Sequence, residues 1–211
     1  MMLGFLFLLL LSACSSLSTT YRYFAFGSNM VPETMTVLRD LSPLSSTAAI
    51  LPDFKLRFSV AGMPLVEPSA AAAERCDGKR VHGVLYELTE EEFARVGITE
   101  GIPFGYRWQA CQVYPYVGDG STAGEEALLT ASSLSAYTLI AGSPMSTDAA
   151  PSKSYRDLLI EGARLWKLDS DCVQQLEDTP YATNLLIPDG LAKATLQAAE
   201  LRKRILSEIK P

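Results

Sequence analysis

Basic residues and histidine are scarce in this chain. It holds 18 Lys and Arg against 24 Asp and Glu, a single His, and a formal net charge of −6. An acidic protein is poorly suited to nucleic acid, because neutralising phosphates requires Lys and Arg. The basic cluster at 202–204 lies in a helical pattern without interleaved aromatic residues. We therefore interpret it as a solvated helix face and expect no nucleic-acid partner.

The side chains that commonly bind metals are also few and scattered. The cysteines lie far apart, at positions 14, 76, 111 and 172, and form no Cys-x-x-Cys pair. This excludes zinc and redox motifs of that kind. His82 is the only histidine, so a His-rich metal site is excluded and any Ser-His-Asp triad would have to use it. Because His82 lies within the strand pattern at 81–88, a structural role is favoured, and we expect no metal site.

The N-terminus carries no charge over residues 1–20 and includes an apolar run at 2–11. That run is too short to cross a bilayer as a helix and has the length of a signal-peptide core. Leu-Ser-Ala-Cys at 11–14 resembles a lipoprotein lipobox, although no Lys or Arg precedes the run. We expect a targeting segment that is cleaved or anchors the chain to a membrane. An over-long gene model of a cytoplasmic protein is the alternative, so localisation stays open.

The rest of the chain has a globular composition, with 48% hydrophobic and 20% charged residues. Alternating or apolar patterns predict strands at 21–26, 48–51, 54–60, 81–88, 106–117, 126–130 and 136–140. Helices are predicted at 32–39, 89–96 (ended by Gly97), 154–166, 169–177 and 191–209, whereas 66–73 is ambiguous between helix and extended chain. Antiparallel strands with inserted and appended helices indicate an α+β fold, either a small antiparallel β-barrel or a strongly bent mixed sheet with flanking helices.

The stretch at 23–30 reads as a strand, a tight loop and the start of a helix. The strand stops at Gly27, and Pro32 with Glu33 suits the first turn of a helix. Such a loop directs free backbone N–H groups at one point, where an anion or a carbonyl oxygen can bind. A loop without any ligand is the alternative interpretation.

Glu100 is the acidic residue without an obvious structural reason. Acids at 90–92 are explained by a helix that Thr89 caps. Glu100 instead lies in a predicted loop among Ile98, Ile102 and Phe104. Apolar surroundings favour proton uptake by a carboxylate, which a general base requires. A solvated loop acid is the alternative.

Three separated segments resemble the γ-glutamylcyclotransferase family. Residues 23–29 are similar to its Tyr-Phe-Ala-Tyr-Gly-Ser-Asn signature, with Phe26 replacing the second Tyr. Glu100-Gly101 followed by Tyr106 is similar to the segment that carries the family's catalytic Glu, and 151–155 to the one ending in a substrate-binding Tyr. Residues 81–86 also resemble its Val-x-Gly-Val strand. The resemblance covers roughly 21–177, without the leader or the tail.

This resemblance implies conversion of a γ-glutamyl amino acid or peptide to 5-oxoproline with release of the amine, without a cofactor. It implies Glu100 as the catalytic base and acid. The substrate-binding residues that it implies are Tyr23, Phe24, Ala25, Phe26, Gly27, Ser28, Asn29 and Tyr155.

Several alternatives remain open. Phe26 lacks a hydroxyl, so a non-catalytic binding or sensor module on the same fold is one alternative; a sister activity on γ-glutamyl-amines or glutathione is another. We expect a targeting segment at 1–20, a catalytic domain at 21–180 and a C-terminal extension at 181–211. The sequence does not name the leaving amine or the oligomeric state, for which a dimer is one option.

Overall fold

The computed structural model of the protein describes residues 19–118, 120–183, 186, 195–202 and 204. Nearly all of the predicted targeting segment at 1–20 therefore lies outside the described residues. The family-like part of the chain, from the first strand onward, is described almost without interruption. No helix among the described residues is long and apolar enough to cross a membrane.

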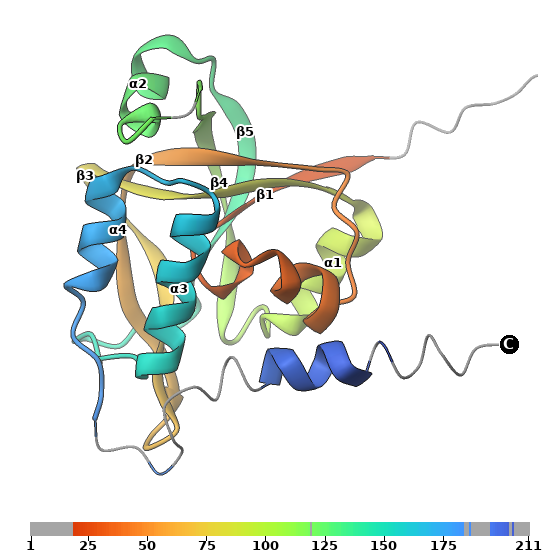
Figure 1. Cartoon of the computed structure of the whole chain (residues 1–211), viewed down its shortest axis with the longest axis vertical. Helices are drawn as coiled ribbons and strands as arrows, with labels where there is room; N and C mark the ends of the chain where they lie inside the picture. The colour runs from red at the N-terminus through yellow and green to blue at the C-terminus, as the bar shows by residue number, and fades with distance from the viewer. Residues whose placement is uncertain (1–18, 119, 184–185, 187–194, 203, 205–211) are drawn as a thin grey trace, which may run out of the picture.

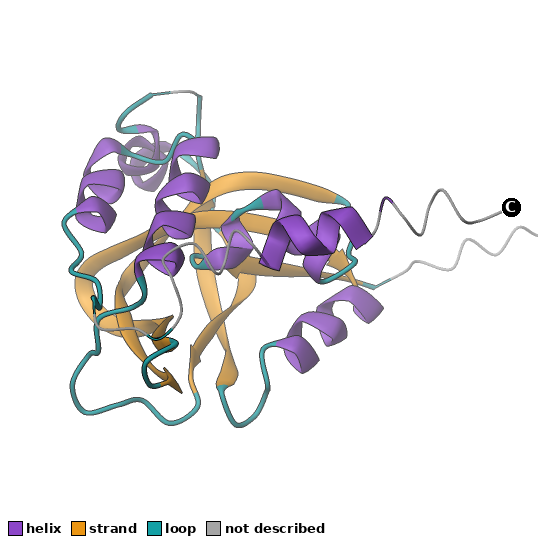
Figure 2. Ribbon diagram, turned by 60° about the horizontal axis from the view of Figure 1, so that its bottom comes forward, coloured by secondary structure: helices purple, strands orange, loops and turns teal. Residues whose placement is uncertain are grey.

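The described strands close into a barrel (Figure 2), and their order is β1-β3-β2-β4-β5. Their bounds are β1 Thr20–Ala25, β2 Ser45–Met63, β3 Glu67–Thr89, β4 Tyr106–Pro115 and β5 Leu134–Ala141. Neighbouring strands are antiparallel except for a parallel contact between β1 and β5, at Tyr23 opposite Tyr137, which closes the barrel. The prediction of a small antiparallel barrel with helices is confirmed.

β1 is the strand that leads into the predicted loop, and it is buried from Tyr23 onward. Phe24 is fully buried, and both Tyr23 and Phe24 belong to the main hydrophobic cluster. A strand that packs on both faces has little freedom to shift its register. The loop that follows therefore begins at a fixed place at one end of the barrel.

β2 and β3 are longer than the sequence pattern indicates. The two strands predicted at 48–51 and 54–60 form one strand, with a register irregularity between Pro52 and Phe54 where Asp53 has φ 58°. From Glu67 on, the alanine-rich segment at 66–73 is extended, as part of β3. Its Ala71 to Ala73 are buried in the core, so tertiary packing outweighs the helix propensity of alanine.

Helices surround the barrel on several sides. They are α1 Glu90–Thr99, α2 Ala123–Thr130, α3 Lys153–Leu165 and α4 Ser170–Glu177, together with a short 3-10 helix Ser28–Met30 (η1) and a π-helix Thr34–Leu38 (η2). Figure 1 shows α3 and α4 side by side, with η1 and η2 between α3 and α1. Residues 195–202 and 204 are also helical, whereas the remainder of the helix predicted at 191–209 lies outside the described residues.

α1 begins as predicted and ends later. Thr89 forms a capping box with Glu92, since each side chain bonds the other residue's backbone N–H. Gly97 does not end the helix: a Cβ there would lie 3.4 Å from the Trp108 indole nitrogen, so the glycine allows close packing. The helix continues to Thr99, and Gly101 follows with φ 69°, the left-handed conformation that suits glycine after a helix.

The strand predicted at 126–130 is wrong, because this segment is the second half of α2. The carboxylate of Asp169 accepts hydrogen bonds from the backbone N–H groups of Gly124 (2.8 Å) and Glu125 (3.0 Å) at the start of this helix. A carboxylate at a helix N-terminus satisfies free N–H groups and favours the helix dipole. This contact joins residues more than forty positions apart, so no local pattern predicts it.

Candidate functional site

A small cavity of about 150 Å³ lies where β1 ends. Seven of the predicted site residues line it: Tyr23, Phe26, Gly27, Ser28, Asn29, Glu100 and Tyr155. The predicted Phe24 and Ala25 do not line it. Phe24 is fully buried in the core, and the Ala25 carbonyl packs against Gly83, where an added Cβ would lie 2.1 Å away. The structure thus brings three distant segments of the sequence together around one space.

Glu100 caps the C-terminus of α1 and faces this cavity. Its side chain is 13% exposed, and its Oε1 accepts a 2.8 Å hydrogen bond from Asn29 Nδ2. The same oxygen forms an ion pair with the guanidinium of Arg39. The carboxylate is therefore an oriented group at the wall of the cavity rather than a solvated loop acid.

Asn29 organises the groups around Glu100. It is 3% exposed, and its amide nitrogen donates both to Glu100 and to the Tyr23 hydroxyl (2.8 Å). Its amide oxygen accepts from Arg39 Nε at 2.9 Å, and its backbone carbonyl accepts from the Tyr86 hydroxyl at 2.9 Å. Both hydrogens of the amide group are thus used. This network fixes the loop after β1 to α1 and to η2.

Arg39 is a site residue that the sequence analysis did not select. It follows directly after the π-helix η2, and its three nitrogen atoms bond Asn29, Thr99 and Glu100. Single π-helical turns occur often at functional sites, because they displace side chains from the regular helical positions. From the sequence, Arg39 appears only as the last residue of a short predicted helix.

Tyr155 and Gly27 meet across the cavity. Tyr155 lies in the first turn of α3, and its hydroxyl accepts a 3.2 Å hydrogen bond from the backbone N–H of Ala71. A Cβ on Gly27 would lie 3.2 Å from that hydroxyl. Gly27 has φ −113°, so the close approach of Tyr155, and not a left-handed backbone, favours glycine here.

The backbone of the loop presents hydrogen-bond donors. The N–H groups of Met30 and Val31 bond back to the carbonyls of Gly27 and Ser28, which forms the turn of η1. The preceding N–H groups, at 27–29, start the turn and have no partner within it. That these N–H groups bind an anion or a carbonyl oxygen stays a prediction.

The phenols around the cavity are uncharged at neutral pH. Burial raises the pKa of Tyr155 and of Tyr23 well above the usual value, and the negative charge of Glu100 adds to the pKa rise of both. Burial likewise raises the pKa of Tyr106, whose hydroxyl donates to the Ala71 carbonyl at 2.8 Å. These hydroxyls therefore remain donors throughout the physiological range.

A second, wider cavity of about 410 Å³ adjoins the first, because Ser28 and Tyr155 line both. Its polar side chains include Arg39 and Glu67, and its apolar ones Leu38 and Leu158. Burial raises the pKa of Glu67, which accepts hydrogen bonds from the backbone and the hydroxyl of Ser152. The two cavities together offer a narrow inner space and a larger outer one.

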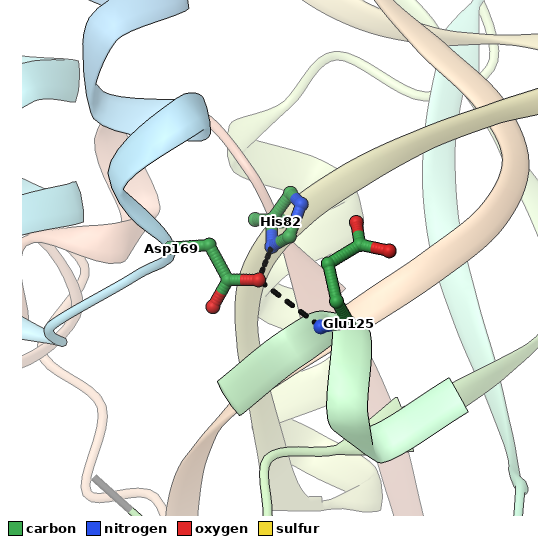
Figure 3. A group of neighbouring side chains, drawn as sticks. All are labelled: His82, Glu125 and Asp169. Carbon is green, nitrogen blue, oxygen red and sulfur yellow. Dashed lines mark hydrogen bonds and ion pairs between the residues drawn. The ribbon is translucent and has the colours of Figure 1, made fainter. Parts of the chain in front are cut away.

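His82, Glu125 and Asp169 form a group of possible metal ligands away from these cavities (Figure 3). Each has a partner in the protein. Asp169 caps α2, and the His82 ring nitrogen Nδ1 lies 2.5 Å from the Tyr116 hydroxyl. Glu125 pairs with Arg80. Burial lowers the pKa of His82, so its ring is neutral near pH 7. These contacts account for the group as a structural connection between β3, α2 and the start of α4.

Comparison of the sequence with curated proteins finds two fungal relatives. A γ-glutamyl cyclotransferase, aclK, of Aspergillus oryzae is 26% identical over 168 residues, which cover 73% of this chain and 59% of the relative. A second, verK of Clonostachys rogersoniana, is 29% identical over 150 residues, or 63% of this chain and 79% of that one. The chain thus spans about three fifths of the Aspergillus protein's length.

Solved structures share the fold. An uncharacterized human protein superposes with a TM-score of 0.67 at 19% identity, over 84% of this chain and 98% of its own. A structure titled γ-glutamyl cyclotransferase gives 0.66 at 19% identity, over 85% and 99%. The family model for AIG2-like γ-glutamyl cyclotransferases matches residues 23–157, which include both the loop after β1 and Glu100. The chain therefore belongs to the AIG2-like γ-glutamyl cyclotransferase family.

Proposed function

We propose that this protein cyclises a γ-glutamyl compound to 5-oxoproline and releases the amine. The observation that carries the proposal is the oriented carboxylate of Glu100 in an inner cavity that the loop at 27–29 also lines. The two adjoining cavities, about 150 Å³ and about 410 Å³, together have room for a γ-glutamyl group and its leaving amine. The family membership and the names of the relatives support the same chemistry.

The reaction needs two protons to move from the α-ammonium of the substrate to the leaving amine. Glu100 takes the first proton, and the resulting amine attacks the γ-carbonyl carbon. A carbon–nitrogen bond forms, which closes a five-membered lactam, and the bond to the leaving amine breaks as Glu100 gives that amine the proton. The ring nitrogen loses its second proton through the same carboxylate, and the amine leaves as an ammonium ion, so atoms and charges balance. Because nucleophile and carbonyl belong to one molecule, holding the chain in a folded shape supplies a high effective concentration.

The loop and Tyr155 would stabilise the charge that develops on the carbonyl oxygen. Gly27, Ser28 and Asn29 line the cavity, and backbone N–H groups at the start of η1 would serve as the donors of an oxyanion site. Tyr155 accepts from Ala71 and keeps its own O–H to donate. Phe26 contributes an apolar wall where other family members have a hydroxyl, which suits exclusion of water.

The test is release of 5-oxoproline by the full chain from γ-glutamyl amino acids, glutathione and γ-glutamyl-lysine, measured by mass spectrometry. In Glu100→Gln we expect turnover to fall at least about a hundredfold, since Gln keeps the hydrogen bonds but takes up no proton. Glu91→Gln is the matched control, because Glu91 lies on α1 with its side chain 83% exposed. Near-normal turnover of Glu100→Gln, or no release from any compound, would refute the proposal. Binding of 5-oxoproline without turnover would favour the binding-module alternative.

A further inference from the structure

Arg39 carries the positive charge of the site. Of the described residues that line the two cavities, it is the one with a cationic side chain, and it lines the outer cavity while its partner Glu100 lines the inner one. Both side chains are 13% exposed. A largely buried ion pair is costly to form from solvated charges, so its presence beside a cavity calls for an explanation beyond stability.

The Arg39 guanidinium has more N–H donors than its three hydrogen bonds use. Arginine has five N–H groups, and Arg39 uses three of its nitrogen atoms, towards Asn29, Thr99 and Glu100. One N–H on each terminal nitrogen is left by these bonds. Guanidinium N–H groups are suited to the oxygens of a carboxylate.

The ion pair is complementary to the head group of an amino acid. A γ-glutamyl group carries its ammonium and its carboxylate on the same carbon atom. A substrate whose ammonium contacts Glu100 therefore has its carboxylate within a few ångströms of Arg39, which already contacts Glu100. The two charges of the pair face the two charges of the substrate with opposite signs.

We propose that Arg39 binds the α-carboxylate of the γ-glutamyl group and thereby selects substrates with a free carboxylate. This inference rests on the proposed function, which supplies the γ-glutamyl substrate, and it adds a residue that selects that substrate. With the carboxylate held by Arg39, the N–H groups at 27–29 are available for the oxyanion. Asn29 and Thr99 hold the guanidinium in place, so the carboxylate is met by a group that needs little reorganisation.

The test compares each ligand with its α-carboxamide, which removes the charge and little else. NMR titration of the full chain with 5-oxoproline and with 5-oxoprolinamide measures selectivity without turnover. The best γ-glutamyl substrate and its α-carboxamide then give KM and kcat. We expect the wild type to favour the carboxylate by roughly 10- to 100-fold, mostly in KM, as for a hydrogen bond between charged groups.

Variants of Arg39 separate binding from structure. In Arg39→Gln we expect most of the preference for the carboxylate to disappear. In Arg39→Lys, which keeps the positive charge but loses the paired N–H donors of the guanidinium, we expect part of the preference to remain. Arg95→Gln on α1 is the control, because Arg95 pairs with Glu91 and lines neither cavity. If Arg39→Gln fails to fold, Arg39→Lys still reports on the selectivity.

The outcomes distinguish the two proposals. Equal losses for carboxylate and carboxamide in Arg39→Gln would make Arg39 a structural residue and overturn the inference, as would a wild type without selectivity or without binding. If no γ-glutamyl compound reacts while 5-oxoproline binds with an Arg39-dependent preference, the proposed function fails and the role of Arg39 stands.

Discussion

The close approach of Gly27 to Tyr155 makes a sharp test of the cavity. A Cβ built on Gly27 lies 3.2 Å from the Tyr155 hydroxyl, which is tighter than nine in ten real Cβ contacts. The hydroxyl has limited room to move, because it accepts the N–H of Ala71 and its ring packs edge-on against Phe58. Gly27→Ala therefore requires a shift of a few tenths of an ångström, and Gly27→Val also brings two methyl groups towards the cavity.

The expected magnitude follows from this overpacking. Inserting methyl groups into a packed site costs typically 1–3 kcal/mol. If that cost falls on the bound state, affinity drops roughly 5- to 150-fold, since each 1.4 kcal/mol is a factor of ten. We expect Gly27→Val to lie at or beyond the upper end and Gly27→Ala near the lower end, with kcat reduced as well because the Gly27 N–H is displaced.

The assay is NMR titration with 5-oxoproline together with KM for the best substrate, after circular dichroism has established that each variant is folded. Gly120→Val is the matched control, because a Cβ on Gly120 would meet no atom within 4 Å. Unchanged affinity in Gly27→Val would mean that the ligand binds elsewhere. An equal loss in Gly120→Val would trace the effect to general destabilisation.

Two stability measurements test contacts outside the proposed chemistry. Asp169→Ala removes the acceptor for two N–H groups of α2, so we expect about 1–3 kcal/mol of lost stability in urea unfolding, against less than about 0.5 kcal/mol for the exposed Asp77→Ala. Equal losses would contradict the capping role. Burial raises the pKa of Tyr23, Tyr106 and Tyr155, so the folded state keeps protons that the unfolded chain releases near pH 10. Stability should thus be level below about pH 9 and fall above about pH 10, by up to about 1.4 kcal/mol per pH unit for each phenol. Stability that stayed level to pH 11 would contradict this reasoning.

Much of the candidate site could be predicted from local sequence. The alternating pattern before Gly27 predicts β1, and the glycine predicts where this strand ends. The capping box of Thr89 and Glu92 predicts the start of α1. These features depend on backbone hydrogen bonds between near neighbours, which a few residues determine by themselves. The sequence placed Glu100 in a loop among apolar residues, and this expectation is wrong. Glu100 lies at the end of α1 with its carboxylate bonded to Asn29 and Arg39, and Ile98 and Phe104 are exposed.

Other features depend on contacts between distant parts of the chain. The sequence predicted a strand for the second half of α2, because its cap, Asp169, lies beyond the next strand and helix. It predicted that Gly97 ends α1, because the packing of Trp108 against that glycine is a tertiary contact. In both cases the local pattern was ambiguous, and burial in the folded protein decided between the alternatives.

The sequence by itself determined the α+β class, because hydrophobic period and turn residues are local properties. The segments that meet at the cavity were indicated by their resemblance to the motifs of the family. Only the tertiary structure decided what surrounds Glu100. Asn29 lies 71 residues away from it and Arg39 61 residues away, yet both bond the same carboxylate oxygen. A hydrogen bond requires that donor and acceptor lie about 3 Å apart in space, whatever their separation in the sequence. The partners of a buried charge therefore become known only from the folded structure.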